Sequence, residues 1–466
     1  MRETSSPENN KLLNVAVVGH TNTGKTSLIR TMLRSTEFGV IEDAAGTTRH
    51  VEQATIAAGN DPILNLHDTP GLEDSNALFM HLKKISSKDR SLSATGVLAR
   101  FVSNITADDP LEQEAKVIRQ VLRSDVLLYI IDVREPMLEK YRYELEILSK
   151  ASKPIIPVFN FIVGHTEELA QWREQLAAFN IHTALEFDTV AFTFEAEKRL
   201  YQKIQTLVDA HYNNLQKLIN YRAKIWDELC LSGAKRVTEL IVSVACYRES
   251  KNTKNGTVAS SLAEDKLHDF IRKAEQLCLK DLLAIYNFSE KDVAIQKIPV
   301  TNGQWQLDIF APGILKAYGL DAGSSALKGA AAGAGIDLMV GGLSLGAASA
   351  IGAIAGAGWS TARRYGREIK AVVDGTQWLC ADESTLRILY LRQKQLLEKL
   401  MHRGHAALHA VEVKVPDSER LPDKWSEITS VLRQNPAWHE SSVSRNNSQQ
   451  YQLIETRLVS SLLNEG

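Results

Sequence analysis

The sequence predicts an α/β domain with a mostly parallel sheet flanked by helices, followed by a mainly α-helical region with a Gly/Ala-rich hairpin. Three observations lead to this fold class. Residues 12–207 alternate short apolar runs with helical stretches, as parallel βαβ units do. From about residue 208 onward, charged and apolar residues recur at helical spacing. The chain of 466 residues also exceeds the size at which a single core stops growing, which favours more than one domain.

Composition and charge narrow the class of protein. Hydrophobic residues make up 44% and charged residues 24% of the chain, which excludes a wholly disordered protein. The formal net charge is −2, so no basic field favours a nucleic-acid partner, and none is expected. The four cysteines form no Cys-x-x-Cys pair, which argues against zinc and disulfides. Residues 1–11 form a polar tail without the apolar stretch of a secretory signal, so we expect a cytoplasmic protein.

Four short apolar runs in the N-terminal part predict buried strands. Each run is nearly continuous and rich in β-branched residues, as strands covered on both faces are. A loop around residues 46–48 and a long polar insertion from Asp74 to Leu111 separate them. The predicted strands are Leu13–Val18, Ile63–His67, Val126–Asp132 and Ile155–Phe159.

The first strand runs directly into a phosphate-binding pattern, which then opens a helix. The pattern reads Gly19-His20-Thr21-Asn22-Thr23-Gly24-Lys25-Thr26. Glycines in such a loop let successive amides wrap the phosphates, and the helix N-terminus adds a favourable dipole. Lys25 should reach the β and γ phosphates, and the Thr26 hydroxyl suits Mg²⁺, which prefers oxygen ligands. The expected nucleotide-binding residues of this loop are Gly19, Asn22, Thr23, Gly24, Lys25, Thr26 and Ser27.

A second motif follows the second predicted strand and reads His67-Asp68-Thr69-Pro70-Gly71. A carboxylate at this strand end can hold Mg²⁺ through water, and the Gly71 amide can bind the γ-phosphate. Two such motifs at the ends of neighbouring strands are far more specific than a glycine-rich turn alone. Together they predict a Mg-nucleotide site.

These residues resemble the Ras-like P-loop GTPases, and within them the Era and TrmE branch found in bacteria. Gly46-Thr47-Thr48-Arg49 and Asp68-Thr69-Pro70-Gly71 match both switch motifs of that branch. The resemblance covers about the first 200 residues. It implies hydrolysis of GTP to GDP and phosphate with Mg²⁺, and it implies that Thr48, with Thr47 as the alternative, coordinates the metal and senses the γ-phosphate. The metal ligands it implies are Thr26, Thr48 and Asp68, and the catalytic residues are Lys25, Thr48, Asn22 and Gly71.

The sequence departs from the family where the base is read. Family members read guanine with Asn-Lys-x-Asp, whereas this chain has Asn160-Phe161-Ile162-Val163, so the Asp is missing. Asn160 remains an expected nucleotide-binding residue, but guanine selectivity is in doubt because a base edge lacks its hydrogen-bond partner. Asp188 is either an alternative base reader or an acidic residue at a strand end.

The catalytic glutamine of many signalling GTPases is also absent, because Leu72 holds its position and cannot polarise water. In TrmE-like members an Asn of the phosphate loop holds a potassium ion instead, and Asn22 matches that Asn in spacing. The resemblance therefore implies K⁺ as a further cofactor, with stimulation by a homodimer or protein partner. The alternative is that Asn22 only caps or stiffens the loop. Glu73 and Asp74 are either water-positioning carboxylates or solvated loop charges.

The Gly/Ala-rich region is the local exception in an otherwise globular composition. Leu338–Ala362 holds no charged residue, and three Gly-xxx-Gly pairs mark close helix approach. We predict a membrane hairpin of Ala322–Val340 and Leu343–Ala362 that binds inner-membrane lipid; a glycine zipper buried in a soluble domain is the alternative. The predicted regions are thus the tail 1–11, the GTPase domain 12–207, a helical region 208–310, the hairpin region 311–370 and a C-terminal helical region 371–466.

The leading functional expectation is a membrane-associated regulatory or remodelling GTPase that binds guanine nucleotide. Era-like RNA or ribosome association is one alternative, although no KH-type Gly-x-x-Gly loop is found in the C-terminal half. A weakly hydrolysing scaffold is the other. Beyond the GTPase domain the chain resembles the uncharacterised C-terminal extension of some bacterial GTPases of this branch.

Overall fold

The protein divides into two compact units. The computed structural model describes residues 12–35, 51–189, 192–252, 256–288, 300–301, 304–305, 308–310, 336–340, 343–344, 376–402, 421–440 and 442–463. The first unit comprises Met1–Asp227 with Met401–Leu408, and the second comprises Glu228–Leu400 with His409–Gly466.

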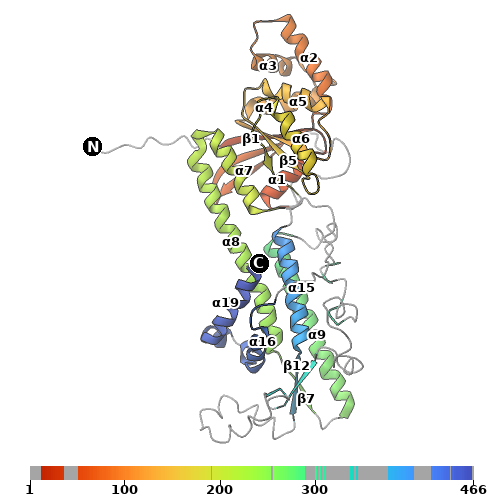
Figure 1. Cartoon of the computed structure of the whole chain (residues 1–466), viewed down its shortest axis with the longest axis vertical. Helices are drawn as coiled ribbons and strands as arrows, with labels where there is room; N and C mark the ends of the chain where they lie inside the picture. Colours follow the sequence, from red (N-terminus) through yellow and green to blue (C-terminus); the bar gives the residue numbers. More distant parts are fainter. Residues whose placement is uncertain are drawn as a thin grey trace, which may run out of the picture. The chain divides into compact units, whose positions relative to one another are not determined.

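A six-stranded sheet forms the centre of the first unit (Figure 1). All neighbouring strands pair in parallel except β2, which pairs antiparallel with β3 at one edge. The predicted α/β fold class is therefore confirmed. The strand order is β2 (Glu52–Ala58), β3 (Asp61–Asp68), β1 (Leu13–Val18), β4 (Val126–Asp132), β5 (Ile155–Asn160) and β6 (Leu185–Glu186).

The register of the sheet gathers polar strand ends at one edge. Val17 of β1 lies opposite Asp68 of β3, and Asp132 of β4 lies opposite Asn160 of β5. Because the carboxyl ends of parallel strands meet at the same edge, the β1–α1 loop, Asp68 and Asn160 are brought together there.

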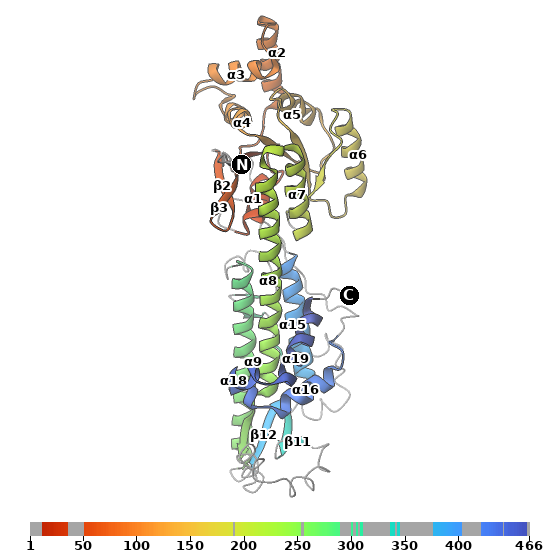
Figure 2. The ribbon, with the colours of Figure 1, turned by 90° about the vertical axis from the view of Figure 1, so that its left-hand side faces the viewer.

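Helices cover both faces of this sheet (Figure 2). The side chains of β1, β4 and β5 alternate between the two cores, so both faces are buried. One face packs against α1 (Lys25–Leu33), α7 (Phe194–Leu207) and the start of α8 (Tyr212–Cys246), which follows the 3₁₀ turn Asp209–His211. The other face packs against α4 (Glu112–Arg123), α5 (Glu139–Ser149) and α6 (Thr166–Ala177).

The polar insertion that we predicted between the second and third buried strands is folded. It forms α2 (Ser75–Lys88) and α3 (Ala94–Asn104), and their apolar side chains join the core on the α4 side of the sheet. Asp74 caps α2 by accepting a hydrogen bond from the Ala77 amide, and Ser93 caps α3 in the same way at Gly96. Capping residues therefore give this polar segment its helix starts.

Three long helices pack together in the second unit (Figure 2). They are α8, α9 (Gly256–Ile285) and α15 (Glu383–Met401). Arg236 of α8 pairs with Asp281 of α9 at 2.6 Å, and buried Arg392 of α15 pairs with buried Glu275 of α9 at 3.3 Å. The described residues of this unit also form α16 (Trp425–Gln434), α17 (Ala437–Glu440), α18 (Ser442–Asn446) and α19 (Gln449–Leu463).

A small antiparallel sheet in the second unit contradicts part of the predicted hairpin. Its strand order is β11 (Leu343–Ser344), β10 (Ile336–Val340), β12 (Thr376–Ala381) and β7 (Glu249–Asn252). Ile336–Val340, which we expected in a helix, instead pairs with β12 over its full length. The backbone groups of β10 thus bond across strands, which a hairpin of two membrane helices does not allow.

Leu343–Ser344, also predicted as part of a helix, form β11, and the rest of the predicted hairpin lies outside the described part of the chain. A further short pair, β8 (Val300–Thr301) with β9 (Gln304–Trp305), lies in the predicted helical region 208–310. Among the described residues, none of the helices combines the length and apolar character that crossing a bilayer requires.

Candidate functional site

The β1–α1 loop, residues 19–24, has the backbone of a phosphate cradle. Asn22 and Gly24 adopt left-handed conformations, with φ of 64° and 95°. A Cβ atom on Gly24 would stand 2.2 Å from the Asn160 amide nitrogen, so only glycine fits there. The loop leads directly into α1, whose N-terminal amides and dipole favour a bound anion.

Lys25 begins α1 with its ammonium group held over the loop. Its Nζ donates to the His20 carbonyl oxygen at 2.6 Å, and the Thr23 hydroxyl donates to the same oxygen at 3.0 Å. Burial lowers the pKa of Lys25, while the nearby carboxylates of Asp68, Glu144 and Glu73 oppose that shift. A buried ammonium that donates to a loop carbonyl suits a phosphate, whose charged oxygens would be stronger partners than that carbonyl.

Asp68 and Thr26 lie side by side where a magnesium ion would bind. The Thr26 hydroxyl donates to Asp68 Oδ2 at 2.6 Å, and Asp68 is 1% exposed. Its other oxygen, Oδ1, is buried without a hydrogen-bond partner. Burial raises the pKa of Asp68 to about 6, against the opposing effects of Thr26 and Lys25. An unpartnered buried carboxylate oxygen beside a hydroxyl fits Mg²⁺, whose charge and bound water would satisfy it.

The β3–α2 loop, residues 69–74, packs tightly against the phosphate loop. A Cβ atom on Gly71 would lie 2.7 Å from the Thr21 amide nitrogen, so the two loops approach to backbone contact. The Leu72 amide donates to the Gly19 carbonyl at 3.2 Å, and the Leu72 side chain is fully buried. Gly71 is therefore next to the loop that would hold the phosphates, and its predicted bond to the γ-phosphate stays a prediction.

Asn160 ties three segments together beneath the nucleotide site. Its side-chain nitrogen donates to the Thr23 carbonyl at 2.9 Å. Its side-chain oxygen accepts from the Phe161 amide, the Thr189 amide and the Thr189 hydroxyl, each at 3.0 Å. The residue is fully buried, so these bonds fix the phosphate loop relative to β5 and the segment after β6.

Phe161 and Arg134 form a flat stack where the family has its base-reading residues. Phe161 adopts φ of 58°, and the Arg134 guanidinium lies 3.9 Å above its ring. Asp132 holds that guanidinium with bonds of 2.9 and 2.6 Å. Val163, at the position of the missing Asp, is 74% exposed. A stacked platform therefore adjoins the phosphate loop in place of a base-edge acceptor.

A buried network that the sequence did not predict supports the loop from below. His20 Nδ1 lies 2.9 Å from Glu144 Oε1, and the Tyr129 hydroxyl donates to Glu144 Oε2 at 2.8 Å. Glu144 is fully buried, and Tyr129 comes from β4. Loop, α5 and strand are thus joined through one carboxylate. The only sequence signal was a Glu on the apolar face of a helix.

The structure brings together all the predicted site residues that it describes. Asn22 is exposed at the tip of the loop, and Ser27 is half-buried in the first turn of α1. Asp188, our alternative base reader, is 8% exposed two residues after β6. The pKa of Arg134 is raised chiefly by its hydrogen bonds to Asp132, and the charge of Asp188 adds a smaller contribution. Thr47 and Thr48 lie outside the described residues.

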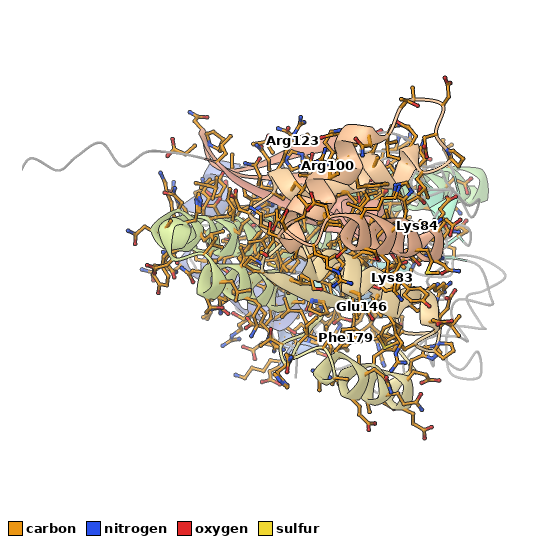
Figure 3. The ribbon with its side chains drawn as sticks, turned by 90° about the horizontal axis from the view of Figure 1, so that it is seen from above. Lys83, Lys84, Arg100, Arg123, Glu146 and Phe179 are labelled. Atoms are coloured by element: carbon orange, nitrogen blue, oxygen red, sulfur yellow. The ribbon has the colours of Figure 1, made fainter. Side chains whose placement is uncertain are left out.

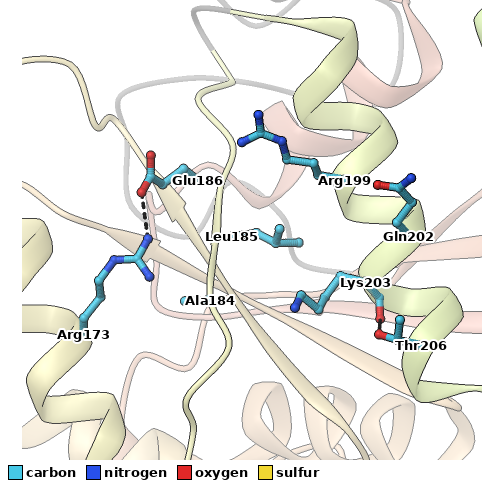
Figure 4. A pocket seen from close by; sticks show the side chains of 8 residues that line it. All are labelled: Arg173, Ala184, Leu185, Glu186, Arg199, Gln202, Lys203 and Thr206. Atoms are coloured by element: carbon cyan, nitrogen blue, oxygen red, sulfur yellow. Dashed lines mark hydrogen bonds and ion pairs between the residues drawn. The ribbon is translucent and has the colours of Figure 1, made fainter.

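Two further cavities lie away from the phosphate loop. One of about 410 Å³ lies at the free edge of β6 (Figure 4). There Arg173 of α6 bonds to Glu186 at 2.7 Å, opposite Arg199 and Lys203 of α7. The other, of about 380 Å³, lies between α2 and α5 beside Lys83, Arg90 and Lys150.

The insertion carries a basic surface. Five basic and one acidic side chains occur among residues 75–104, whereas the whole chain has a net charge of −2. Exposed Lys83, Lys84, Arg100 and Arg123 lie across α2, α3 and α4 when the unit is viewed end-on (Figure 3). This surface is locally basic although the protein is not.

Comparison with known proteins assigns both parts of the chain. A family model described as a 50S ribosome-binding GTPase matches residues 14–161, and one described as a domain of unknown function (DUF3482) matches residues 173–460. The GTPase Der of Campylobacter concisus (strain 13826) is 24% identical over 221 residues, covering 46% of this chain and 41% of that protein. The tRNA modification GTPase MnmE of Mycoplasma mycoides subsp. mycoides SC is 27% identical over 146 residues, 31% of each chain.

This chain spans less than half the length of each of these two relatives. A crystal structure of Era with MgGDPNP and a segment of 16S ribosomal RNA is 18% identical, covering 38% of this chain and 51% of that one. The TM-score of that match is 0.26. The sheet, the loop and the sequence matches make the N-terminal unit a P-loop GTPase domain of the Era, Der and TrmE type. Because the second family model covers more than half of the chain, this protein belongs to the family described as a domain of unknown function, DUF3482.

Proposed function

We propose that this protein binds GTP with Mg²⁺ and hydrolyses it to GDP and phosphate. The observation that carries the proposal is the pair of Thr26 and Asp68, with a buried carboxylate oxygen left unpartnered beside the phosphate loop. Thr26 and Asp68 would hold the ion, and Thr48 would complete its ligands. Bound there, Mg²⁺ would neutralise charge that builds up on the phosphates during transfer.

The chain's own residues would bind and orient the triphosphate. The loop amides and the α1 dipole favour the β and γ phosphates, and Lys25 would exchange the His20 carbonyl for phosphate oxygens. The Gly71 amide would bind the γ-phosphate, since its loop already contacts Thr21. Positioning and charge stabilisation supply most of the catalysis in phosphoryl transfer.

The base would be held chiefly by stacking. The Phe161 ring and the Arg134 guanidinium offer a flat surface next to Gly24, whereas the exposed Val163 cannot accept a hydrogen bond from a base edge. Stacking is tolerant of base identity because every base has a π-face. We therefore expect GTP to be preferred over ATP by a smaller factor than in family members that carry the Asp.

Phosphate release from the full-length protein tests the proposal. Wild type should release phosphate from GTP in the presence of Mg²⁺ and lose that activity in EDTA. Lys25→Ala should reduce the rate by at least about 100-fold, because a preorganised charge on the transferring phosphate is removed. Lys84→Ala, an exposed lysine of α2, is the matched control and should leave the rate unchanged. A wild-type protein that binds GTP but releases no phosphate would favour the scaffold alternative.

Potassium stimulation is a separate proposal that rests on Asn22. Its side chain is exposed, and its backbone is left-handed with φ of 64°; in the phosphate loop we expect that side chain to face a bound nucleotide. A cation there would supply the charge that an arginine finger supplies elsewhere. We expect the rate at equal ionic strength to be at least about tenfold higher in KCl than in NaCl, and the difference to vanish in Asn22→Ala. Equal wild-type rates in both salts would contradict the proposal.

A regulatory role at the inner membrane, with lipid or a protein partner, remains the broader proposal. Its membrane part rests only on the composition of the undescribed residues of 311–370, since Ile336–Val340 forms a strand. Flotation of the full-length protein with anionic vesicles, with and without GTP, tests it. Recovery of all protein in the bottom fraction under both conditions would contradict it.

A second candidate function is association with ribosomal RNA, which the basic insertion favours. Lys83, Lys84 and Arg100 are exposed on one surface, and clustered cations bind phosphate backbones in a salt-dependent way. Sedimentation with ribosomes through sucrose at 50 and 300 mM salt tests this. Association should be lost in Lys83→Glu/Lys84→Glu and kept in Glu174→Lys, a charge change on exposed α6.

A further inference from the structure

The β3–α2 loop is fixed on both sides of one carboxylate, Glu73. On the N-terminal side, the Leu72 side chain is fully buried and its amide bonds to Gly19. On the C-terminal side, the Asp74 amide donates to Glu114 at 3.1 Å and the Asp74 carboxylate caps α2. Glu114 is itself 3% exposed. The backbone at Glu73 is thus anchored on both sides, while its side chain remains exposed.

The Glu73 carboxylate reaches the mouth of the phosphate loop. The Thr21 hydroxyl donates to Glu73 Oε1 at 3.3 Å, and Thr21 is the loop residue against which Gly71 packs. Burial lowers the pKa of Lys25, and the charge of Glu73 opposes that shift after the charges of Asp68 and Glu144, so the Glu73 carboxylate is within electrostatic range of the loop ammonium. With the γ-phosphate bound by the Gly71 amide as proposed, Glu73, two residues further along the same loop, would lie on the side from which water approaches.

The side chains near Glu73 are either buried in the core or already hydrogen-bonded to other groups. Leu72, at the position of the usual glutamine, points into the core formed with α2, α3 and α4. Asp74 caps a helix, and Asp68 is bonded to Thr26. The Thr69 hydroxyl in the β3–α2 loop donates to the Val17 carbonyl at 2.8 Å. With Asp68 and Asp74 bonded as described, Glu73 is the carboxylate that faces the mouth of the phosphate loop.

We propose that Glu73, aligned by Thr21, is the catalytic residue that orients and deprotonates the attacking water. This rests on the proposed function, since it presupposes that GTP is hydrolysed at the loop. The water oxygen forms a bond to the γ-phosphorus while the bond from that phosphorus to the β–γ bridging oxygen breaks. The proton of the water passes to the Glu73 carboxylate and then to the released phosphate, and GDP keeps the bridging oxygen.

Single-turnover phosphate release from the full-length protein with Mg-GTP tests this assignment. General-base catalysis contributes about 100-fold or more, so Glu73→Ala should slow the chemical step by at least about that factor. The rate of the chemical step in Glu73→Gln should fall between those of wild type and Glu73→Ala, because an amide can orient water but cannot accept its proton. Affinity for a fluorescent GDP analogue should change less than about twofold, since the residue acts on the transition state. Glu174→Gln, an exposed carboxylate on α6, is the matched control.

Chemical rescue separates a catalytic from a structural carboxylate. Formate at 50–100 mM, roughly a hundredfold excess over an ordinary millimolar dissociation constant, should raise the Glu73→Ala rate several-fold and leave wild type unchanged. If Glu73→Ala turns over at the wild-type rate, or binds nucleotide more tightly at an unchanged rate, Glu73 only blocks the empty loop and the assignment is wrong. If wild type binds GTP without hydrolysing it, both this assignment and the proposed function fail.

Discussion

At the scale of single residues, the buried carboxylate of Asp68 makes the stability of the GTPase domain depend on pH. Burial raises its pKa from 3.8 to about 6, so folding favours the protonated form. The contribution of protonated Asp68 to the free energy of unfolding is therefore complete below about pH 4. It is lost as the pH rises through 6, which lowers the free energy of unfolding by about 3 kcal/mol. Urea unfolding without nucleotide should show this loss between pH 4 and 6.5. Asp68→Asn should flatten it, whereas exposed Asp108→Asn should not.

The same ionisation acts in the opposite sense on binding, because Mg²⁺ requires the carboxylate. Affinity for Mg-GDP should fall as the pH drops below about 6, whereas affinity for GDP in EDTA should fall less. Titration calorimetry at pH 5.5 and 7.5 measures both. Equal pH dependence with and without Mg²⁺ would show that Asp68 is not near the metal.

Val163 gives a residue-scale test of base recognition. It is 74% exposed, so Val163→Asp should cost little stability while restoring the carboxylate that family members use. A charged hydrogen bond contributes about 1.5–3 kcal/mol, so GDP should gain roughly ten- to hundredfold over IDP, which lacks the exocyclic amine. Val163→Asn supplies similar size without the charge and should gain less. A wild-type protein that already prefers GDP over ADP by more than about 100-fold would show that another residue reads the base.

At the scale of elements, buried charges hold α1, α7 and α8 together. Glu197 of α7 is fully buried, pairs with Arg34 at 3.3 Å and Arg222 at 3.6 Å, and accepts from Tyr201. Glu197→Gln would leave two arginines without their counter-charge, and breaking a buried pair in this way costs about 3–5 kcal/mol. The midpoint of urea unfolding should fall accordingly. Glu195→Gln on the exposed face of α7 should leave it nearly unchanged.

The local pattern of apolar residues in the sequence predicted the strands that are buried along their whole length on both faces of the sheet. β1 and β4 are buried on both faces, so their apolar runs fixed their bounds, and the glycine-rich loop identified α1. β2 was missed because it is a half-exposed edge strand with charged and small residues. The pair of His20 and Glu144 was missed because its members are 124 residues apart and meet only in the folded sheet.

The prediction of a helix over Ile336–Val340 was wrong for a related physical reason. A short, mainly apolar run such as Ile336–Val340 suits a packed helix and a buried strand alike, so its composition does not distinguish the two. The strand conformation is stabilised by β12, which lies about 40 residues further along the chain and forms the backbone hydrogen bonds of the pair. Non-local pairing of this kind leaves no periodic signal in the segment itself.

At the scale of the whole molecule, α8 gives a nucleotide signal a covalent path from one unit into the other. Its first turns pack Leu215 and Leu218 into the core beside α1, and Arg222 donates to the Met32 carbonyl at the end of α1 at 3.1 Å. The same 35-residue helix continues beyond Asp227 into the second unit. A change at the phosphate loop that shifts α1 would therefore bias α8, because a helix transmits displacement along its length.

Hydrogen exchange of the full-length protein tests this coupling. A non-hydrolysable GTP analogue, compared with GDP, should alter exchange in α8 beyond residue 228 by at least about twofold. Asp227→Gly/Glu228→Gly, which weakens the helix by about 1 kcal/mol per glycine, should reduce that difference while leaving GTP turnover unchanged. Lys273→Gly, at an exposed position of α9, is the control for helix weakening alone. It should keep the difference in exchange between the two nucleotides. If exchange beyond residue 228 is the same with both nucleotides, α8 carries no signal and the second unit responds to something other than the nucleotide state.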